Sequence, residues 1–219
     1  MPSDVCRKRL PVTGVILAGG KSRRMGANKA LMPLGNDSLI GHVIRRMRRI
    51  TDDLLLITNT STEYAHLGLP MYADIVPDSG ALGGIYTGLT QAASDVVICV
   101  ACDSPFLEPR LLKYLASVLG EHDAVMPYTY SGADNTQVTL QTLCAVYAKR
   151  CLPILASMLE EDELRVHALA ERVDVHRISS DIWRQLDPDG MSFFNINTPE
   201  ALARADSYLK SQLAPSTFA

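Results

Sequence analysis

Short apolar runs alternate along the chain with segments in which apolar residues recur at helical spacing. The run Val12–Ala18 is rich in β-branched residues and ends at two glycines, which is typical of a fully buried strand. After Ser38, apolar residues follow one another every three or four positions, and Ser38 or Asp37 is the expected N-cap of a helix. Thr198–Glu200 marks the start of a last helix, with Thr as N-cap and Pro at the first position.

The same reasoning predicts the other elements. Strands are expected at residues 54–58, 73–76, 95–101, 124–126, 138–147, 173–178 and 192–196. Helices are expected at residues 85–93, 109–119, 150–160 and 163–171. Buried strands that alternate with helices indicate an α/β fold of three layers, with a mostly parallel central sheet covered on both faces. We find no repeat and no linker, so residues 1–219 are expected to form one domain, with residues 1–11 flexible.

Composition and charge narrow the class of protein. Hydrophobic residues make up 47% of the chain and charged residues 21%, which excludes a disordered chain. No run of 18 apolar residues occurs, so no membrane-spanning helix is expected. The net charge of −3 is unevenly distributed, because residues 1–49 carry +9 and residues 50–219 carry −12. The basic first quarter indicates an anionic partner or, alternatively, a solvated basic face.

Cysteine and histidine usage favours a cytoplasmic protein without a structural metal. The five cysteines are an odd number, and the first residues lack the apolar stretch of a signal peptide. Cys99 and Cys102 have C-x-x-C spacing, but on a strand their Cα atoms lie about 10 Å apart, too far for a disulfide. We therefore expect both to be core residues. No metal-site spacing relates the five histidines; His42 is expected on the surface and Trp183 in a small separate cluster.

The first loop, Leu17–Lys29, combines glycines with positive charge directly after a strand. Such glycines let backbone N–H groups approach a phosphate closely. The cations of the loop are Lys21, Arg23, Arg24 and Lys29. A P-loop would need glycine at position 15, which is Val15, and a dinucleotide-binding fingerprint fails because Gly19 and Gly20 are adjacent. The open readings are a nucleotide loop of another kind and an ordinary strand-to-helix turn.

Two acidic residues follow predicted strands. Asp103 ends the most apolar strand, where a lone carboxylate either caps a helix or meets a cation. Mg²⁺ binds through one or two carboxylates plus phosphate oxygens and water, so one Asp is sufficient. Asp78 opens a second glycine-containing loop, 78–84, for which simple turn chemistry is the alternative. Because ligands bind beyond the carboxyl ends of parallel strands, we expect these loops and Asn59 to converge on one crevice.

Four landmarks occur in a fixed order along residues 13–203. They are Leu17-Ala18-Gly19-Gly20-Lys21-Ser22-Arg23-Arg24-Met25-Gly26 with Lys29, Asp78 with Leu82-Gly83-Gly84, Cys102-Asp103-Ser104-Pro105, and Phe194-Asn195-Ile196-Asn197-Thr198-Pro199. This order resembles the molybdenum cofactor nucleotidyltransferases, and most closely the guanylyltransferase family. Gly19 is typical of the guanylyl branch, since cytidylyl relatives usually have Ala there. The chain departs from the family pattern at Ala81, where Pro is usual.

The resemblance implies a Rossmann-like nucleotidyltransferase fold, with a nucleotide-binding half at residues 12–105 and an acceptor-binding half at residues 106–211. It implies a GTP site formed by Leu17, Ala18, Gly19, Gly20, Lys29, Asn59, Asp78, Leu82, Gly83 and Asp103. Lys29 and Arg24 are then expected to act on the phosphates as catalytic residues. Asp103 is expected to be both a catalytic residue and the ligand of a Mg²⁺ cofactor.

The implied reaction transfers GMP from GTP to the phosphate of Mo-molybdopterin and releases pyrophosphate. The implied partners are these two substrates, molybdenum-insertion proteins and molybdoenzyme-specific chaperones, with neither nucleic acid nor membrane among them. Arg45, Arg46, Arg48 and Arg49 lie on one predicted helix without interleaved aromatics, which favours a solvated face or a docking surface over nucleic-acid binding. The alternatives are transfer from CTP or to another phosphorylated acceptor, and a non-catalytic carrier of GTP or molybdopterin.

Two asparagines near the end of the chain have two possible roles. Asn195 and Asn197 flank the capping Thr198, so they either form local turn and cap bonds or face the metal or the pterin. For the pterin itself, the sequence indicates only the carboxyl-terminal half, with Arg165 as one candidate contact.

Overall fold

The computed structural model describes residues 11–19, 28–131 and 137–213. In these residues, eight strands form one sheet in the order β10-β7-β9-β6-β1-β4-β5, with β8 paired to β7. The strands are β1 (Thr13–Leu17), β4 (Leu54–Ile57), β5 (Met71–Tyr72), β6 (Val96–Ala101), β7 (Ala124–Ser131), β8 (Gln137–Leu140), β9 (Cys144–Ala148) and β10 (Val175–Ile178). β9 runs antiparallel to β6 and β7, and β8 antiparallel to β7, whereas the other neighbours are parallel. The predicted mostly parallel sheet is confirmed.

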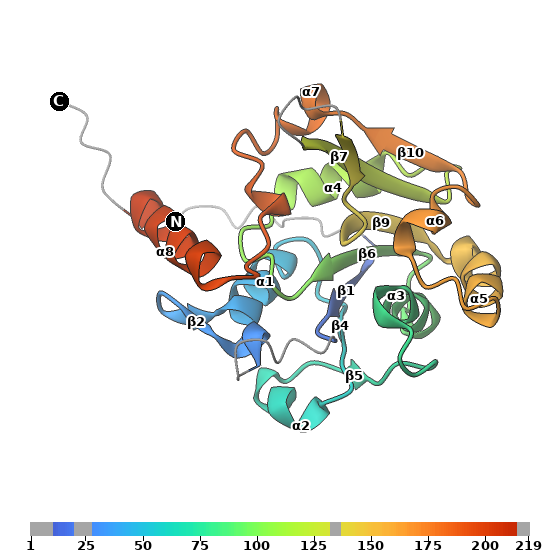
Figure 1. The fold of residues 1–219 in the computed structure, drawn as a ribbon, viewed down its shortest axis with the longest axis horizontal. Helices are drawn as coiled ribbons and strands as arrows, with labels where there is room; N and C mark the ends of the chain where they lie inside the picture. Colours follow the sequence, from blue (N-terminus) through green and yellow to red (C-terminus); the bar gives the residue numbers. More distant parts are fainter. Residues whose placement is uncertain (1–10, 20–27, 132–136, 214–219) are drawn as a thin grey trace, which may run out of the picture.

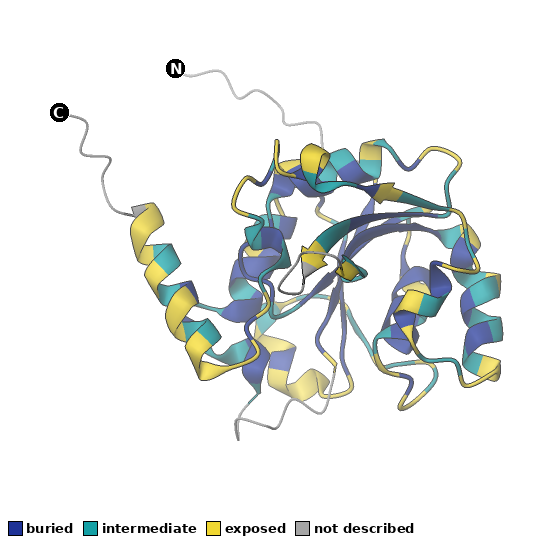
Figure 2. Ribbon diagram, turned by 45° about the horizontal axis from the view of Figure 1, so that its top comes forward, coloured by how far each residue is buried: buried dark blue, intermediate teal, exposed yellow. Residues whose placement is uncertain are grey.

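Helices cover both faces of this sheet, as Figure 1 shows. α1 (Leu39–Met47) and α4 (Pro109–Ser117) supply apolar side chains to the first face. α3 (Gly80–Gln91), α5 (Leu152–Glu160) and α6 (Val166–Leu169) supply them to the second face. Figure 2 shows the buried strands between the two helical layers, with exposed residues on the outer sides. The predicted three-layer α/β architecture is therefore confirmed. No helix in the described ranges combines the length and the apolar character that crossing a bilayer requires.

The carboxyl ends of three central strands are level with one another. All five residues of β1 are buried, and β1 pairs with β4 on one side and with β6 on the other. Leu17, the last residue of β1, is in register with Ile57 of β4 and with Ala101 of β6. The segments that follow these strands therefore emerge at the same edge of the sheet, where ligands of such folds bind.

The predicted helix caps are confirmed. The hydroxyl of Ser38 accepts a hydrogen bond from the N–H of Gly41, and that of Thr198 accepts one from Ala201. Thr198 precedes α8 (Pro199–Leu213), which lies in Figure 1 beside the short hairpin of β2 (Pro33–Leu34) and β3 (Asp37–Ser38). A small third core joins these parts: Leu34, Leu39, Phe106, Ile196 and Ala205. The last helix is thereby packed against the segment that follows the first loop.

Several predicted boundaries are wrong, because tertiary contacts decide them. The strand predicted at 73–76 lies earlier, as β5 at Met71–Tyr72, where it pairs with β4. The strand predicted at 138–147 is two strands, β8 and β9, separated by a turn in which Cys144 N–H donates to Gln141 O. Helix α3 begins at Gly80, within the segment predicted as a loop, because close packing outweighs the poor helix propensity of glycine.

The strand predicted at 192–196 is also wrong. Residues Met191–Phe193 form a 3-10 turn, because the buried carboxylate of Asp187 accepts hydrogen bonds from the N–H groups of Met191 and Ser192. Trp183 belongs to the core of the first face, not to a separate cluster, and its indole N–H donates to Tyr128 O.

The basic helix is less exposed than the sequence indicates. His42 was expected on the surface, yet it is buried, with Nε2 2.9 Å from the carbonyl oxygen of Leu34. The guanidinium of Arg46 is half-buried, donates to Leu107 O and lies over the ring of Phe106. Arg45 pairs with Asp37. Since only Arg48 and Arg49 of the four arginines lack such contacts among the described residues, the solvated face is smaller than predicted.

Gly88 allows α3 to pack directly on β1. A Cβ atom at this position would lie 2.6 Å from Cγ1 of Val15 and 3.1 Å from its Cγ2. We expect Gly88→Ala to lower the free energy of unfolding by about 1–3 kcal/mol, because overpacking exceeds the gain in helix propensity. Denaturant titration measures the change, and the exposed Thr90→Ala on the same helix is the control. A Gly88→Ala protein as stable as the unaltered chain would contradict the close approach.

Candidate active site

A largely buried ion pair lies at the carboxyl edge of the sheet. The ammonium of Lys29 donates a hydrogen bond of 2.6 Å to Oδ2 of Asp103, and the two side chains are 8% and 19% exposed. Lys29 donates a second bond of 2.6 Å to Oδ1 of Asn197. Lys29 therefore joins three segments that lie far apart in the sequence. The lysine predicted to bind phosphate is in direct contact with the aspartate predicted to bind the metal.

Lys29 is held in place by the residue before it. Asn28 caps the 3-10 turn Lys29–Leu31 by accepting the N–H of Ala30 at Oδ1. The same oxygen accepts the hydroxyl of Tyr64, and the amide of Asn28 donates to Glu63. Burial raises the pKa of Tyr64 to about 12, so its hydroxyl keeps its proton for this bond. Tyr64 and Glu63 belong to α2 (Ser61–Tyr64), which anchors the end of the first loop.

The backbone around Asp103 is fixed on two sides. The N–H of Cys102 donates to Leu17 O, which continues the pairing of β6 with β1 beyond the strand end. On the other side, the N–H of Ile196 donates to Asp103 O at 3.1 Å. The carboxylate therefore projects from a position determined by the sheet and by the segment before α8.

One oxygen of Asp103 makes no hydrogen bond in the described part of the chain. Oδ1 is buried and has no hydrogen-bond partner among the described residues. Leaving a buried carboxylate oxygen unpaired is costly, so this oxygen is a candidate ligand for a cation. In the described part of the chain, no three His, Cys, Asp or Glu side chains gather into a metal site. A single carboxylate of this kind suits Mg²⁺, which keeps water and phosphate oxygens as its other ligands.

The strand end of β1 and the start of α3 pack together. Gly84 lies so close to Leu17 that a Cβ atom there would be 3.2 Å from its Cδ2. Leu82 is fully buried, and a Cβ atom at Gly83 would overlap the side chain of Ser79. At Gly19 the corresponding space is open, and this residue is exposed. The predicted nucleotide residues Leu17, Ala18, Gly19, Leu82 and Gly83 thus lie on two neighbouring elements, with open space above Gly19.

Asp78 and Asn59 lie at the same edge of the sheet. Asp78 has a φ of 58°, a left-handed conformation that Asp tolerates better than most residues. It turns the chain into α3 just before Gly80. Asn59 follows β4, and its side chain exchanges two hydrogen bonds with Asp74. The amide of Asn59 is therefore partly used in holding the loop before α3.

Gly20 and Arg24, both predicted site residues, lie outside the described residues, as do Lys21 and Arg23. The structure places the remaining predicted residues at one edge. Asn195 and Asn197 do not cap α8, because Thr198 does so. The oxygen of Asn195 accepts the hydroxyl of Ser104, just as the oxygen of Asn197 accepts Lys29.

From the sequence, Asn195 and Asn197 had two possible roles, in local turn and cap bonds or toward the metal or the pterin. The contribution of Tyr64 was missed, and only the tertiary contact with Asn28 identifies it.

The cysteines near Asp103 provide no nucleophile. Cys99 is fully buried, as predicted, and burial raises the pKa of its thiol. Cys102 is partly exposed as a residue, yet burial raises the pKa of its thiol to about 12. A thiol with this pKa carries almost no thiolate near neutral pH.

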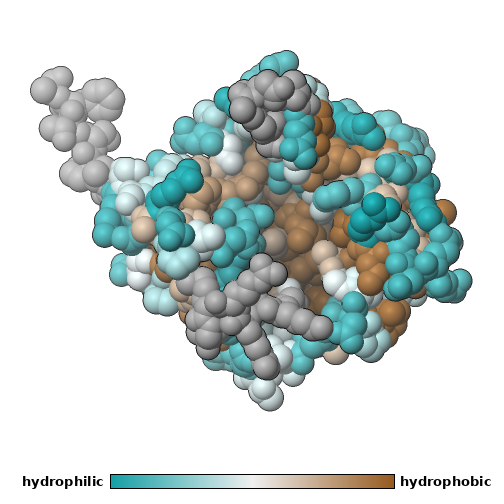
Figure 3. Space-filling view, viewed as in Figure 1, coloured by the Kyte–Doolittle hydropathy of each residue, from teal (hydrophilic) through white to brown (hydrophobic). Residues whose placement is uncertain are grey.

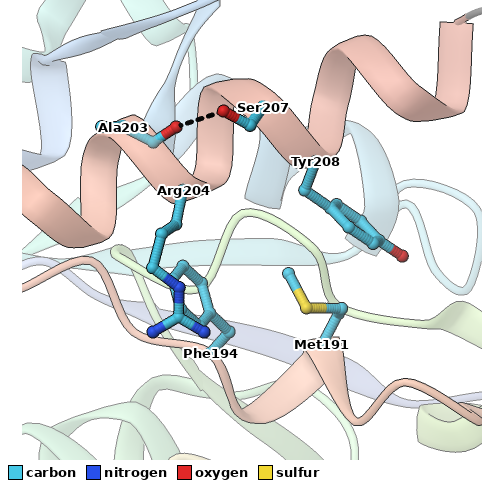
Figure 4. Close-up of a pocket in the computed structure, with 6 residues that line it drawn as sticks. All are labelled: Met191, Phe194, Ala203, Arg204, Ser207 and Tyr208. Atoms are coloured by element: carbon cyan, nitrogen blue, oxygen red, sulfur yellow. Dashed lines mark hydrogen bonds between the residues drawn. The ribbon is translucent and has the colours of Figure 1, made fainter.

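One pocket among the described residues is separate from the ion pair. It has a volume of about 400 Å³ and lies between α8 and the 191–194 turn. Figure 4 shows Arg204 over the ring of Phe194, with Met191 and Tyr208 beside them. None of the predicted site residues lines it. Figure 3 shows a second feature, a hollow with apolar surface near the centre of the face seen in Figure 1.

Comparison with known proteins identifies the fold and the family of the chain. A sequence model of the MobA-like NTP transferase domain matches residues 14–175. The chain superposes with a TM-score of 0.76 on molybdopterin-guanine dinucleotide biosynthesis protein A from Archaeoglobus fulgidus, at 23% identity, covering 91% of this chain and 99% of that one. A 4-diphosphocytidyl-2C-methyl-D-erythritol synthase from Anaerococcus prevotii gives a TM-score of 0.68 at 16% identity, with coverages of 91% and 96%. The fold and the family define the chain as a nucleotidyltransferase.

Curated relatives define the branch. The molybdenum cofactor guanylyltransferase of Desulfosudis oleivorans is 35% identical over 91% of this chain and 96% of that protein. A probable molybdenum cofactor guanylyltransferase of Carboxydothermus hydrogenoformans is 36% identical over 86% of this chain and 91% of its own length. The chain belongs to the molybdenum cofactor guanylyltransferase family.

Proposed function

We propose that this chain transfers GMP from GTP to the terminal phosphate of Mo-molybdopterin. A bond forms between an acceptor phosphate oxygen and the α-phosphorus of GTP. The bond from the α-phosphorus to the bridging oxygen breaks, and pyrophosphate leaves with that electron pair. The products are the guanine dinucleotide form of the cofactor and pyrophosphate. The observation that carries this proposal is the largely buried Lys29–Asp103 pair, which lies where β1 and β6 end level with one another.

The residues of the amino-terminal half bind the nucleotide. Leu17, Ala18, Gly19 and Gly20 hold the base and ribose, together with Asn59, Asp78, Leu82 and Gly83. Lys29 and Arg24 neutralise the triphosphate. The packing of Leu17 on Gly84 supports this arrangement, because it brings the two glycine-containing segments onto one site. The amino-terminal half, residues 12–105, supplies all of these residues.

The acceptor supplies its own nucleophile. A phosphate monoester has a second pKa near 6, so it is largely ionised at pH 7. No general base is therefore needed to activate this group. The protein contributes positioning and charge neutralisation, which suffice for phosphoryl and nucleotidyl transfer.

Mg²⁺ is the proposed cofactor, and Asp103 is the residue that holds it. When bound, the ion neutralises charge on the phosphates and on the leaving pyrophosphate. The unpaired Oδ1 of Asp103 supports this role, because Lys29 occupies only the other oxygen. Asn197, by accepting a bond from Lys29, keeps the ammonium directed at the same place.

The decisive experiment offers the protein both nucleotides. The purified chain is incubated with Mo-molybdopterin, Mg²⁺ and an equal mixture of GTP and CTP, and the dinucleotide product is identified by mass spectrometry. We expect the guanine dinucleotide together with pyrophosphate in equal amount. A cytosine product would support the cytidylyl alternative, and binding without pyrophosphate release would support a carrier. Either result would overturn the proposal.

A further inference from the structure

A second pocket lies on the opposite side of Asp103 from the nucleotide segments. In the sheet order, β6 has β1 on one side and β9 on the other. The nucleotide segments follow β1 and β4, whereas this pocket is formed where β8 turns into β9. Its volume is about 180 Å³, and the residues that line it include Ser104, Gln141, Phe193 and Asn195.

The pocket is joined to the ion pair through two chain segments. Ser104 directly follows Asp103, and its hydroxyl donates to Asn195 at 2.6 Å. Asn195 in turn lies two residues before Asn197, which accepts the bond from Lys29. A ligand whose phosphate reaches Lys29 and Asp103 from this side therefore has the rest of its structure directed toward the pocket.

The lining of the pocket suits a planar heterocycle with amide-like edges. Phe193 supplies an aromatic wall, held edge to face by Trp183 with ring centroids 4.9 Å apart. Gln141 uses its amide nitrogen on Thr129, which leaves its carbonyl oxygen as an acceptor toward a ligand. Asn195 uses its oxygen on Ser104, which leaves its amide N–H groups as donors. Aromatic walls with a few placed polar groups are typical of small-molecule sites.

The size of the pocket limits what it can hold. Pockets that bury a whole drug-sized ligand have volumes of about 300–1,000 Å³. At about 180 Å³, this pocket takes one ring system rather than a complete nucleotide.

The candidate contact Arg165 belongs elsewhere. It occupies the position before α6, on the second face of the sheet, and its side chain pairs with Glu163, whose pKa it lowers to about 2 through side-chain hydrogen bonds.

We propose that this pocket holds the pterin ring system of the acceptor, with Gln141 and Asn195 as its hydrogen-bonding residues and Phe193 as its wall. The inference rests on the proposed function, because it identifies the acceptor side of the same site. It also explains why two asparagines lie in the segment before α8. Asn197 faces the ion pair, and Asn195 faces the pocket.

The first test uses unsubstituted pterin, which carries no phosphate. Trp183 is the only tryptophan of the chain, so its fluorescence reports on Phe193 directly. We expect saturable quenching as pterin is added, with the dissociation constant raised about tenfold in Gln141→Ala and in Asn195→Ala, since each loses a hydrogen bond. Gln91→Ala, a glutamine exposed at the end of α3, is the matched control and should bind like the unaltered chain.

The second test measures both substrates of the complete reaction. We expect Gln141→Ala to raise the KM for Mo-molybdopterin about tenfold while the dissociation constant for GTP stays unchanged. An unchanged KM for Mo-molybdopterin in Gln141→Ala and in Asn195→Ala would overturn the assignment of the pocket. So would the absence of saturable quenching by pterin in a chain that makes the dinucleotide. Quenching by pterin in a chain that makes no dinucleotide would instead overturn the proposed function and leave the ligand class of the pocket supported.

Discussion

Asp103→Asn should lower nucleotidyl transfer at least about 100-fold while the protein remains folded. Asparagine keeps a side-chain oxygen that can accept the hydrogen bond Lys29 donates to Asp103 at 2.6 Å, but this acceptor is neutral. The negative charge is lost, and with it the only described carboxylate at the Lys29 ammonium. A bound metal contributes several kcal/mol to such a reaction, and each 1.36 kcal/mol is a factor of ten in rate. Asp103→Ala should abolish turnover as well.

The measurement is pyrophosphate release against Mg²⁺ concentration. Asp74→Asn is the matched control, because Asp74 lies at the same edge, is exposed, and accepts a side-chain hydrogen bond from Asn59. Thermal unfolding of both variants shows that the fold is retained. Normal Mg²⁺-dependent turnover in Asp103→Asn would reject the metal-ligand role, and the buried pair would then be structural.

Lys29→Ala should reduce kcat/KM for GTP at least about tenfold. The lost group is a charge-assisted donor, and such bonds contribute about 1.5 kcal/mol or more to transition-state stabilisation. Lys29 also neutralises Asp103, so its removal leaves a carboxylate that is only 19% exposed without its cation. The same variant should therefore also be less stable than the unaltered chain, since an unpaired buried charge is costly.

Two comparisons separate binding from stability for this lysine. Lys29→Met removes the charge but keeps much of the buried stem, so it should fold better than Lys29→Ala and show the same loss in kcat/KM. Lys210→Ala, which removes an exposed lysine of α8 paired with Asp206, is the control for general charge effects. An unchanged kcat/KM for GTP in both Lys29 variants would remove this residue from the phosphate site.

The order of the strands and helices could be predicted from the sequence, because a strand covered on both faces appears as a short run of apolar residues. The runs that became β1, β4 and β6 are almost entirely apolar, which is typical of strands inside a covered sheet. The caps at Ser38 and Thr198 were readable because capping is local chemistry. Asp103 stood out for the same kind of reason, since a carboxylate directly after such a strand requires a partner.

The start of α3 could not be predicted from the local sequence. Its first turn contains Gly80, Gly83 and Gly84, which predict a loop when propensity is considered alone. The structure makes this segment helical because Gly84 must approach Leu17 and Gly83 must approach Ser79. The burial of His42 is a similar case, because its partner, Leu34 O, lies in a hairpin that no helical pattern shows.

The sequence by itself determined the class of fold, the order of the landmark residues and the edge of the sheet at which they meet. Only the tertiary structure decided that Lys29 contacts both Asp103 and Asn197, across 74 and 168 positions of the chain. It also decided that Asn195 turns toward Ser104 and the pocket beside it. The physical reason is that strand and helix patterns record burial within an element. Contacts between loops depend on register and on the third core beneath α8, which the pattern of single segments does not contain.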